Sequence, residues 1–101
     1  MLFAVVCIDR AETGLVRARA LDAHRGYING CVHALVTSGP LLAEDGTTRN
    51  GQLYIIDVAD RDAADTFVRE DPFTQADLFE TILVRRIKPV IANGQRIRPL
   101  R

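Results

Sequence analysis

The sequence predicts an α+β fold in which one antiparallel β-sheet carries helices on one face. Three observations support this prediction. Four short apolar segments have the pattern of strands, two segments have the pattern of helices, and their order along the 101 residues is strand, helix, strand, strand, helix, strand. This βαββαβ order is that of the ferredoxin-like fold, whose four strands form a single antiparallel sheet.

The first strand is expected over residues 2–8. The run Leu-Phe-Ala-Val-Val-Cys-Ile is apolar at every position, which is typical of a central strand buried on both faces. Asp9 ends the run, and Gly14 fits the loop before a helix.

Residues 15–35 have the spacing of a helix. Apolar residues and one histidine recur at intervals of three and four, which places them on one helical face. The members of this face are Leu21, His24, Ile28, Cys31 and Leu35.

The second and third strands are expected over residues 36–42 and 51–58. Pro40 has no N–H to donate to a sheet, so the strand that contains it lies at an edge or carries a bulge, and Gly39 favours a bulge beside Pro40. The dipeptide Asp45-Gly46 provides a turn between the two strands.

A second helix and a fourth strand complete the core. Asp60 can cap a helix, which should end by Asp71 because a residue that precedes proline avoids helical geometry. Residues 73–78 fit one further turn, and residues 81–87 read as the last core strand.

The C-terminal residues predict a small extension to this core. Asn93-Gly94 between apolar-containing flanks is a strong hairpin signal. We therefore expect a single domain over residues 1–101, with a core at 1–89 and a C-terminal β-ribbon extension at 90–101.

Composition and charge exclude several function classes. Thirteen basic and thirteen acidic residues cancel, which argues against nucleic acid as the main partner because phosphate binding needs a basic excess. The basic residues near the C-terminus lack interleaved aromatic residues and predict a solvated or interface surface. They are Arg85, Arg86, Lys88, Arg96, Arg98 and Arg101.

No segment predicts a membrane span or a signal peptide. The longest apolar run has about six residues, whereas a span needs about twenty. Cys7 and Cys31 lie in apolar surroundings, as reduced core thiols of a cytoplasmic protein do. No spacing of histidine and cysteine suggests a metal site, and no glycine-rich cofactor motif is present, so we expect no metal and no cofactor.

Four motifs together resemble the YCII-related (YciI-like) family over residues 1–89. They are Ala23-His24, Tyr27-Ile28, Ser38-Gly39-Pro40-Leu41 and Asp71-Pro72-Phe73. The resemblance implies a homodimer whose two sheets face each other, a dimeric α+β barrel. The sequence leaves open a higher oligomer, in which dimers assemble further through the Asn93-Gly94 ribbon. Leu21-Asp22 and Arg25 depart from the usual pattern of the family around the histidine.

The resemblance also implies a site. By position, His24 and Asp71 are its catalytic pair. The expected substrate-binding residues, which flank this pair in the motifs, are Ser38, Gly39, Tyr27 and Phe73.

The residues themselves leave a plainer interpretation open at each position. His24 shares a face with apolar residues, so it is either a core histidine or a proton-transfer group. Asp71 either orients the imidazole or caps a turn. His33 is half a turn out of phase and should face solvent, and Arg17 and Arg19 are expected on a solvated face rather than at an anionic substrate.

Three functions follow as alternatives. The first is a cofactor-independent enzyme in which His24 and Asp71 perform acid–base chemistry, an isomerisation or an elimination, on a small organic molecule such as a cyclic or aromatic one. The second is a non-catalytic accessory dimer that binds a small molecule, and the third is a structural interaction domain. A Ser–His–Asp hydrolase is disfavoured because the nucleophile-elbow context is missing.

Overall fold

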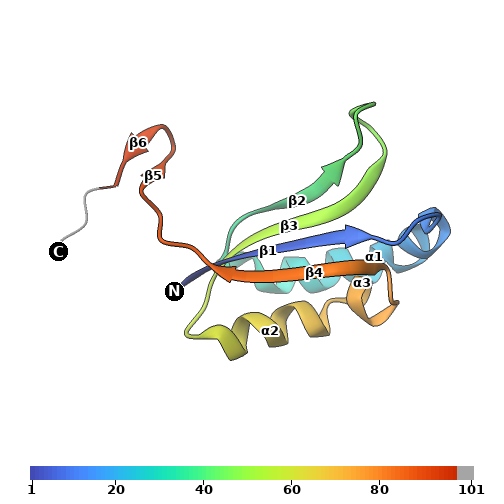
Figure 1. Ribbon diagram of the computed structural model, residues 1–101. Helices are drawn as coiled ribbons and strands as arrows, with labels where there is room; N and C mark the ends of the chain where they lie inside the picture. Colours follow the sequence, from blue (N-terminus) through green and yellow to red (C-terminus); the bar gives the residue numbers. More distant parts are fainter. Residues whose placement is uncertain (98–101) are drawn as a thin grey trace.

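One four-stranded antiparallel sheet forms the body of the protein, and a computed structural model describes it over residues 1–97 (Figure 1). The core elements in chain order are β1 (Leu2–Asp9), α1 (Gly14–Cys31), a short 3-10 turn η1 (Val32–Ala34), β2 (Leu35–Leu42), β3 (Arg49–Asp57), α2 (Arg61–Glu70), α3 (Pro72–Gln75) and β4 (Phe79–Arg86). The predicted ferredoxin-like βαββαβ order is confirmed, with α3 as the expected further turn.

The strands lie in the order β2-β3-β1-β4. In the register of the central pair, Val5 is opposite Tyr54 on β3 and opposite Val84 on β4. The predicted central position of β1 and edge position of β2 are therefore both confirmed. At the edge, Pro40 of β2 pairs with Gln52 in regular register.

The bulge expected at Gly39 is elsewhere on the same strand. Gly39 and Pro40 pair with Leu53 and Gln52 without interruption, and the register shifts near Val36 and beside Leu42. An edge strand leaves one side of its backbone unpaired, so Pro40 needs no bulge to avoid a missing donor.

The expectation that β1 is buried on both faces is wrong for the single chain. Phe3, Val5 and Cys7 are buried, whereas Ala4 and Val6 between them are only half-buried. Alternate residues of a strand point to opposite faces, and both long helices lie against one face of the sheet (Figure 1). Among residues 1–97, no helix covers the other face, which carries apolar side chains such as Val6, and we call it the bare face.

Helix α1 is shorter than predicted. It ends at Cys31, and Leu35 begins β2 instead of completing the helical face. His24 is buried, while Leu21 and Ile28 are half-buried against the core. His33 is exposed, as predicted.

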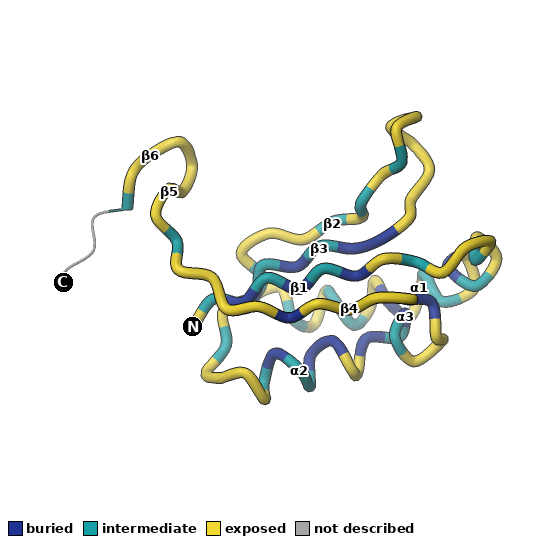
Figure 2. The backbone as a smooth tube through the Cα atoms, in the orientation of Figure 1, coloured by how far each residue is buried: buried dark blue, intermediate teal, exposed yellow. Residues whose placement is uncertain are grey.

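Helix α2 begins and ends where the sequence predicts. The Asp60 side chain accepts a hydrogen bond from the N–H of Ala63, which satisfies one of the free donors at the helix start. Asp71 has an extended backbone and ends the helix directly before Pro72. The core between helices and sheet is buried in Figure 2, where dark blue marks alternate positions of β1, several positions of β3 and one side of α2.

The C-terminal ribbon is present as strands β5 (Ile91–Ala92) and β6 (Gln95–Arg96). Asn93 and Gly94 at its turn both have positive φ, 53° and 74°, as a two-residue type I′ hairpin turn requires. Arg98, Arg101 and the end of the expected extension lie outside the described residues.

The basic residues that the structure describes near the C-terminus are all exposed; they are Arg85, Arg86, Lys88 and Arg96. Among residues 1–97, no helix is long and apolar enough to cross a membrane.

Candidate active site

His24 and Asp71 meet in the interior, although 47 positions separate them along the chain. Imidazole Nδ1 and carboxylate Oδ1 lie 2.8 Å apart. The His24 side chain is 8% exposed, and that of Asp71 is fully buried. His24 comes from the sheet-facing side of α1 and Asp71 from the α2–α3 junction, so helix packing brings the pair together.

Asp71 accepts hydrogen bonds from three donors. The N–H of Phe73 bonds Oδ1 at 2.9 Å and so caps α3. The hydroxyl of Tyr54 donates to Oδ2. An ionised carboxylate accepts and does not donate, so this set of donors places the hydrogen of the neutral imidazole on Nδ1 of His24. The other ring nitrogen, Nε2, then carries the free lone pair.

The negative charge of Asp71 affects the groups around it. Burial, together with this charge, raises the pKa of Tyr54, which therefore remains a donor across the physiological range. Burial is also the main cause that raises the pKa of the Cys7 thiol to about 12, with Asp71 and Asp9 adding to it. Cys7 is accordingly a neutral core thiol and not a nucleophile.

Phe73 lies against the imidazole. The two rings are stacked, with centroids 3.9 Å apart and planes inclined by 11°. The guanidinium carbon of Arg17 lies 4.8 Å from the same phenyl centroid. Arg17 and His24 are two turns apart on α1, about 10.5 Å along the axis, so the phenyl ring fits between them and limits rotation of the imidazole.

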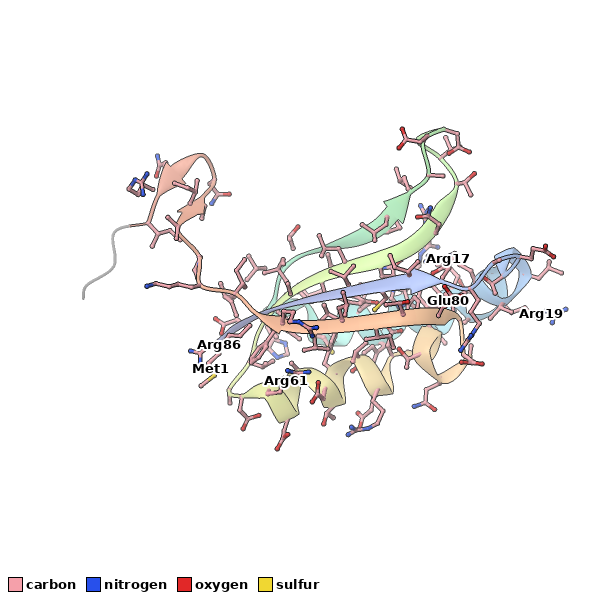
Figure 3. All side chains as sticks on the ribbon, in the orientation of Figure 1. Met1, Arg17, Arg19, Arg61, Glu80 and Arg86 are labelled. Atoms are coloured by element: carbon pink, nitrogen blue, oxygen red, sulfur yellow. The ribbon has the colours of Figure 1, made fainter. Side chains whose placement is uncertain are left out.

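The solvated position expected for Arg17 is wrong. Its side chain is 9% exposed and forms an ion pair with Asp9, from Nε to Oδ2 at 2.9 Å. It also donates to Oε1 of Gln52 and to the carbonyl of Gly51. A buried charge requires such partners. Arg19 is exposed as expected, and Figure 3 shows it extending away from the body.

The prediction missed two buried residues of the site, Arg17 and Tyr54, although the sequence contained a signal for each. Arg17, Leu21 and His24 are spaced four and three apart, which continues the buried helical face by one turn. Tyr54 lies two positions after Gln52 on β3, and alternate strand residues share a face. A buried tyrosine hydroxyl usually finds a partner, so Tyr54 was a candidate neighbour of a buried acid.

The residues expected to bind substrate are not all near the pair. Phe73 is buried against His24. Ser38 is exposed on β2 opposite Tyr54, and thus on the helix side of the sheet, whereas Gly39 is on the bare side. Tyr27 donates its hydroxyl to the carbonyl of Phe67 and stacks on that ring, where burial raises its pKa.

Two hollows lie at opposite ends of the sheet. The larger, about 730 Å³, is lined by Met1 and Leu2, by Asp57 at the end of β3 and by residues 86–89 at and after the end of β4. The smaller, about 320 Å³, lies between the β1–α1 loop and the start of β3, and Asp9 forms part of its wall. Asp9, in the wall of this hollow, forms the ion pair with Arg17, and Arg17 in turn lies over the phenyl ring that stacks on His24. Within residues 1–97, no three potential ligands gather to hold a metal ion.

Comparison with solved structures relates the fold of this chain to that of an enzyme. The chain is similar to the 5-chloro-2-hydroxyhydroquinone dehydrochlorinase TftG of Burkholderia phenoliruptrix, whose structure contains 2,5-dihydroxybenzoquinone. The two share 30% identity with a TM-score of 0.80, over 87% of this chain and 94% of TftG. No curated protein sequence matches the chain. The model of the YCII-related domain matches residues 1–88, and the chain therefore belongs to the YCII-related family.

Proposed function

We propose that this protein is a cofactor-independent enzyme in which His24 and Asp71 perform acid–base chemistry on a small hydroxylated ring. The observation that supports it most directly is the 2.8 Å contact between His24 Nδ1 and Asp71 Oδ1. A carboxylate in this position holds the imidazole in one tautomer and stabilises the imidazolium that forms when the ring accepts a proton.

Nε2 of His24 is the atom that exchanges the proton. With Nδ1–H donated to Asp71, Nε2 removes a proton from a substrate hydroxyl or ring carbon. In an elimination the imidazolium first delivers its proton to the ring carbon that bears the chlorine. Nε2 then takes the proton of a second hydroxyl, and the electron pair freed there forms a carbonyl and expels chloride, so that HCl is lost overall. In an isomerisation the imidazolium returns the proton to another ring atom. Either course matches the neutral-pH range in which histidine changes charge.

The substrate class comes from similarity to TftG. That enzyme acts, by its name, on a chlorinated hydroxyhydroquinone, and it shares 30% of its sequence and the fold with this chain. We therefore propose a hydroxylated, cyclic or aromatic substrate, with Ser38, Gly39, Tyr27 and Phe73 as the substrate-binding residues to be tested.

We further propose that two copies assemble through the bare sheet face, in the cytoplasm. The face carries apolar side chains, of which Ile8 is 40% and Leu83 is 42% exposed. Covering such a surface with a second copy removes it from water. The two free cysteines suit a reducing compartment.

One observation favours a second candidate, a dimer that binds a small molecule without turnover. The two hollows described above, about 730 and 320 Å³, do not include His24 in their walls. A ligand held in either would lie outside direct reach of the imidazole. This candidate needs a cavity but no proton transfer.

Turnover of a substrate panel tests the proposal. Hydroxyhydroquinones with and without a ring chlorine are incubated without oxygen, and absorbance follows the formation of quinone. His24→Asn should lower the rate by about 10²–10⁴-fold, the usual contribution of a general acid or base. The matched control is His33→Asn, which changes an exposed histidine of the same chain.

Binding of 2,5-dihydroxybenzoquinone, followed by thermal shift, separates the two candidates. Binding without turnover of any panel member would favour the accessory dimer. Equal rates for the wild type and His24→Asn would refute the acid–base role of His24.

A further inference from the structure

We propose that residues 90–97 form an arm that packs against a second copy of the chain and enlarges the dimer interface. This inference rests on the homodimer of the proposed function and adds a separate contact to it. The segment that we call the arm contains β5, β6 and the Asn93-Gly94 turn.

The arm has no core of its own. Ile91 pairs with Arg96, and the N–H of Ile97 bonds the carbonyl of Val90 at 2.7 Å. Neighbouring residues of a strand point to opposite faces, so both faces of the ribbon carry a large apolar side chain. Val90 is 49% and Ile91 is 54% exposed, and Figure 2 shows the ribbon almost wholly exposed.

The arm also stands away from the body. The bond from the N–H of Ile87 to the carbonyl of Leu2 joins the end of β4 to β1. Beyond it, the backbone hydrogen bonds found in residues 88–97 run within the ribbon. A two-stranded hairpin alone is at best marginally stable in water, so contact with another surface is needed to hold this one.

A second copy offers that surface because the arm and the bare face lie on the same side. The ribbon leaves the end of β4 and rises on the side of the sheet away from α2 (Figure 1). The bare face includes Val6 and Leu83, which lie opposite each other on β1 and β4. A copy that covers this face is therefore placed beside the arm. A two-fold axis gives each copy the same contact.

The area of the bare face agrees with a need for more contact. Four strands of eight or nine residues span about 26 by 19 Å, or about 500 Å², at the usual spacings. Two such faces together present about 1,000 Å² in projection, near the low end of the accessible area of about 1,200–2,000 Å² that specific interfaces bury. An arm from each copy adds to this contact.

The arm lies beyond the part of the chain that the family shares. The YCII-related match ends at residue 88, and the arm begins two residues later. The contact thus lies outside the matched domain, whose residues 1–88 contain the four-stranded sheet and its helices.

Sedimentation velocity over a range of concentrations tests the arm in the full chain. Ile91→Asp places a charge on its exposed apolar side and should raise the dimer dissociation constant about tenfold or more. Gln95→Glu is the matched control, since it adds the same charge at an exposed ribbon position without removing an apolar side chain. A chain that ends at Pro89 should show at least the loss seen for Ile91→Asp.

Each other outcome overturns the inference. A dissociation constant unchanged by Ile91→Asp would remove the arm from the interface, and equal losses in Ile91→Asp and Gln95→Glu would indicate a general charge effect. A wild type that is monomeric throughout would refute both the arm and the dimer. Turnover that depends on His24 is measured separately, so the acid–base proposal stands or falls by itself.

Discussion

The hydroxyl of Tyr54 bonds Oδ2 of Asp71, the carboxylate oxygen that His24 does not use. Tyr54 comes from the middle of β3 and is fully buried. The sheet therefore fixes the acid from one side while α1 presents the histidine from the other. The orientation of the imidazole thus depends on the packing of two layers and not on a loop.

Tyr54→Phe should destabilise the fold by about 1–3 kcal/mol, because a buried charged acceptor loses its partner. The ring and its edge contact with Phe67 stay in place, so no cavity of side-chain size forms. The free energy of unfolding in urea measures the loss. Turnover should also fall, since Asp71 is less firmly held.

Tyr27→Phe is the matched control for this change. Its hydroxyl also donates a 2.8 Å bond, but to the neutral carbonyl of Phe67 and in a partly buried position. Removing it should cost about 0.5–1.5 kcal/mol, and the comparison of the two variants is one of stability alone. Equal losses of stability in the two variants would contradict the special role of the Tyr54–Asp71 bond.

Arg17→Ala should destabilise the fold strongly. It leaves Asp9, whose side chain is 7% exposed, as an unpaired buried charge, and breaking a buried pair costs about 3–5 kcal/mol. It also removes the cation from the face of Phe73. Urea denaturation measures this loss against Arg19→Ala, an exposed position on the same helix where the change should stay within about 0.5 kcal/mol.

The double variant Asp9→Leu with Arg17→Met tests whether the unpaired charge of Asp9 causes the loss of stability in Arg17→Ala. Replacing both charges with apolar groups removes the unpaired ion, so much of the stability should return. If the double variant is no more stable than Arg17→Ala, the loss comes from packing and not from the isolated carboxylate.

Local patterns predicted the elements because each depends on neighbours in sequence. The intervals around His24, the cap at Asp60 and the turn at Asn93-Gly94 are properties of short segments, and each occurs as expected. The apolar run of β1 showed that both its faces are apolar. It did not show that only one is covered within the chain, which depends on where the helices pack.

The site was predictable only in part. The proximity of His24 and Asp71 followed from family resemblance, since no periodicity relates residues 47 positions apart. The burial of Arg17 depends on Asp9, Gln52 and Gly51, which come from two other elements. Charge alone suggests an exposed arginine, and partners distant in sequence reverse that expectation.

Gly51 and Gly39 differ in the space that they leave for a side chain, and this difference decides which of them can be changed without loss of stability. A Cβ on Gly51 would lie 2.4 Å from the carbonyl oxygen of Cys7, whereas one on Gly39 would meet nothing within 4 Å. Gly51→Ala should therefore cost about 1–3 kcal/mol, as overpacking does, and Gly39→Ala should leave stability nearly unchanged.

Gly39 can then be examined for its predicted contact with substrate. A raised KM in Gly39→Ala, with the thermal midpoint of the wild type, would support a place for Gly39 in the site. An unchanged KM would remove it from the set of binding residues, and a large loss of stability would contradict the open space around it.

The β2–β3 loop should lose stability in acid through Asp45. Its carboxylate accepts bonds from Thr47 N and from both the N–H and the hydroxyl of Thr48, and these lower its pKa from 3.8 to about 2. The pKa of Asp45 is lower in the folded chain than in the unfolded chain. The ionised carboxylate therefore makes its full contribution to stability above about pH 4, and this contribution is lost as the pH falls toward 2. The thermal midpoints of the wild type and Asp45→Asn should therefore converge over that range.

Glu44→Gln is the control for this convergence, because it removes a neighbouring exposed charge and leaves the three hydrogen bonds in place. Between pH 5 and pH 2, the difference in thermal midpoint between Glu44→Gln and the wild type should change little. The corresponding difference for Asp45→Asn should change more. The same change in both variants would mean that net charge governs the acid response of the loop, and the hydrogen bonds to Asp45 would then not explain it.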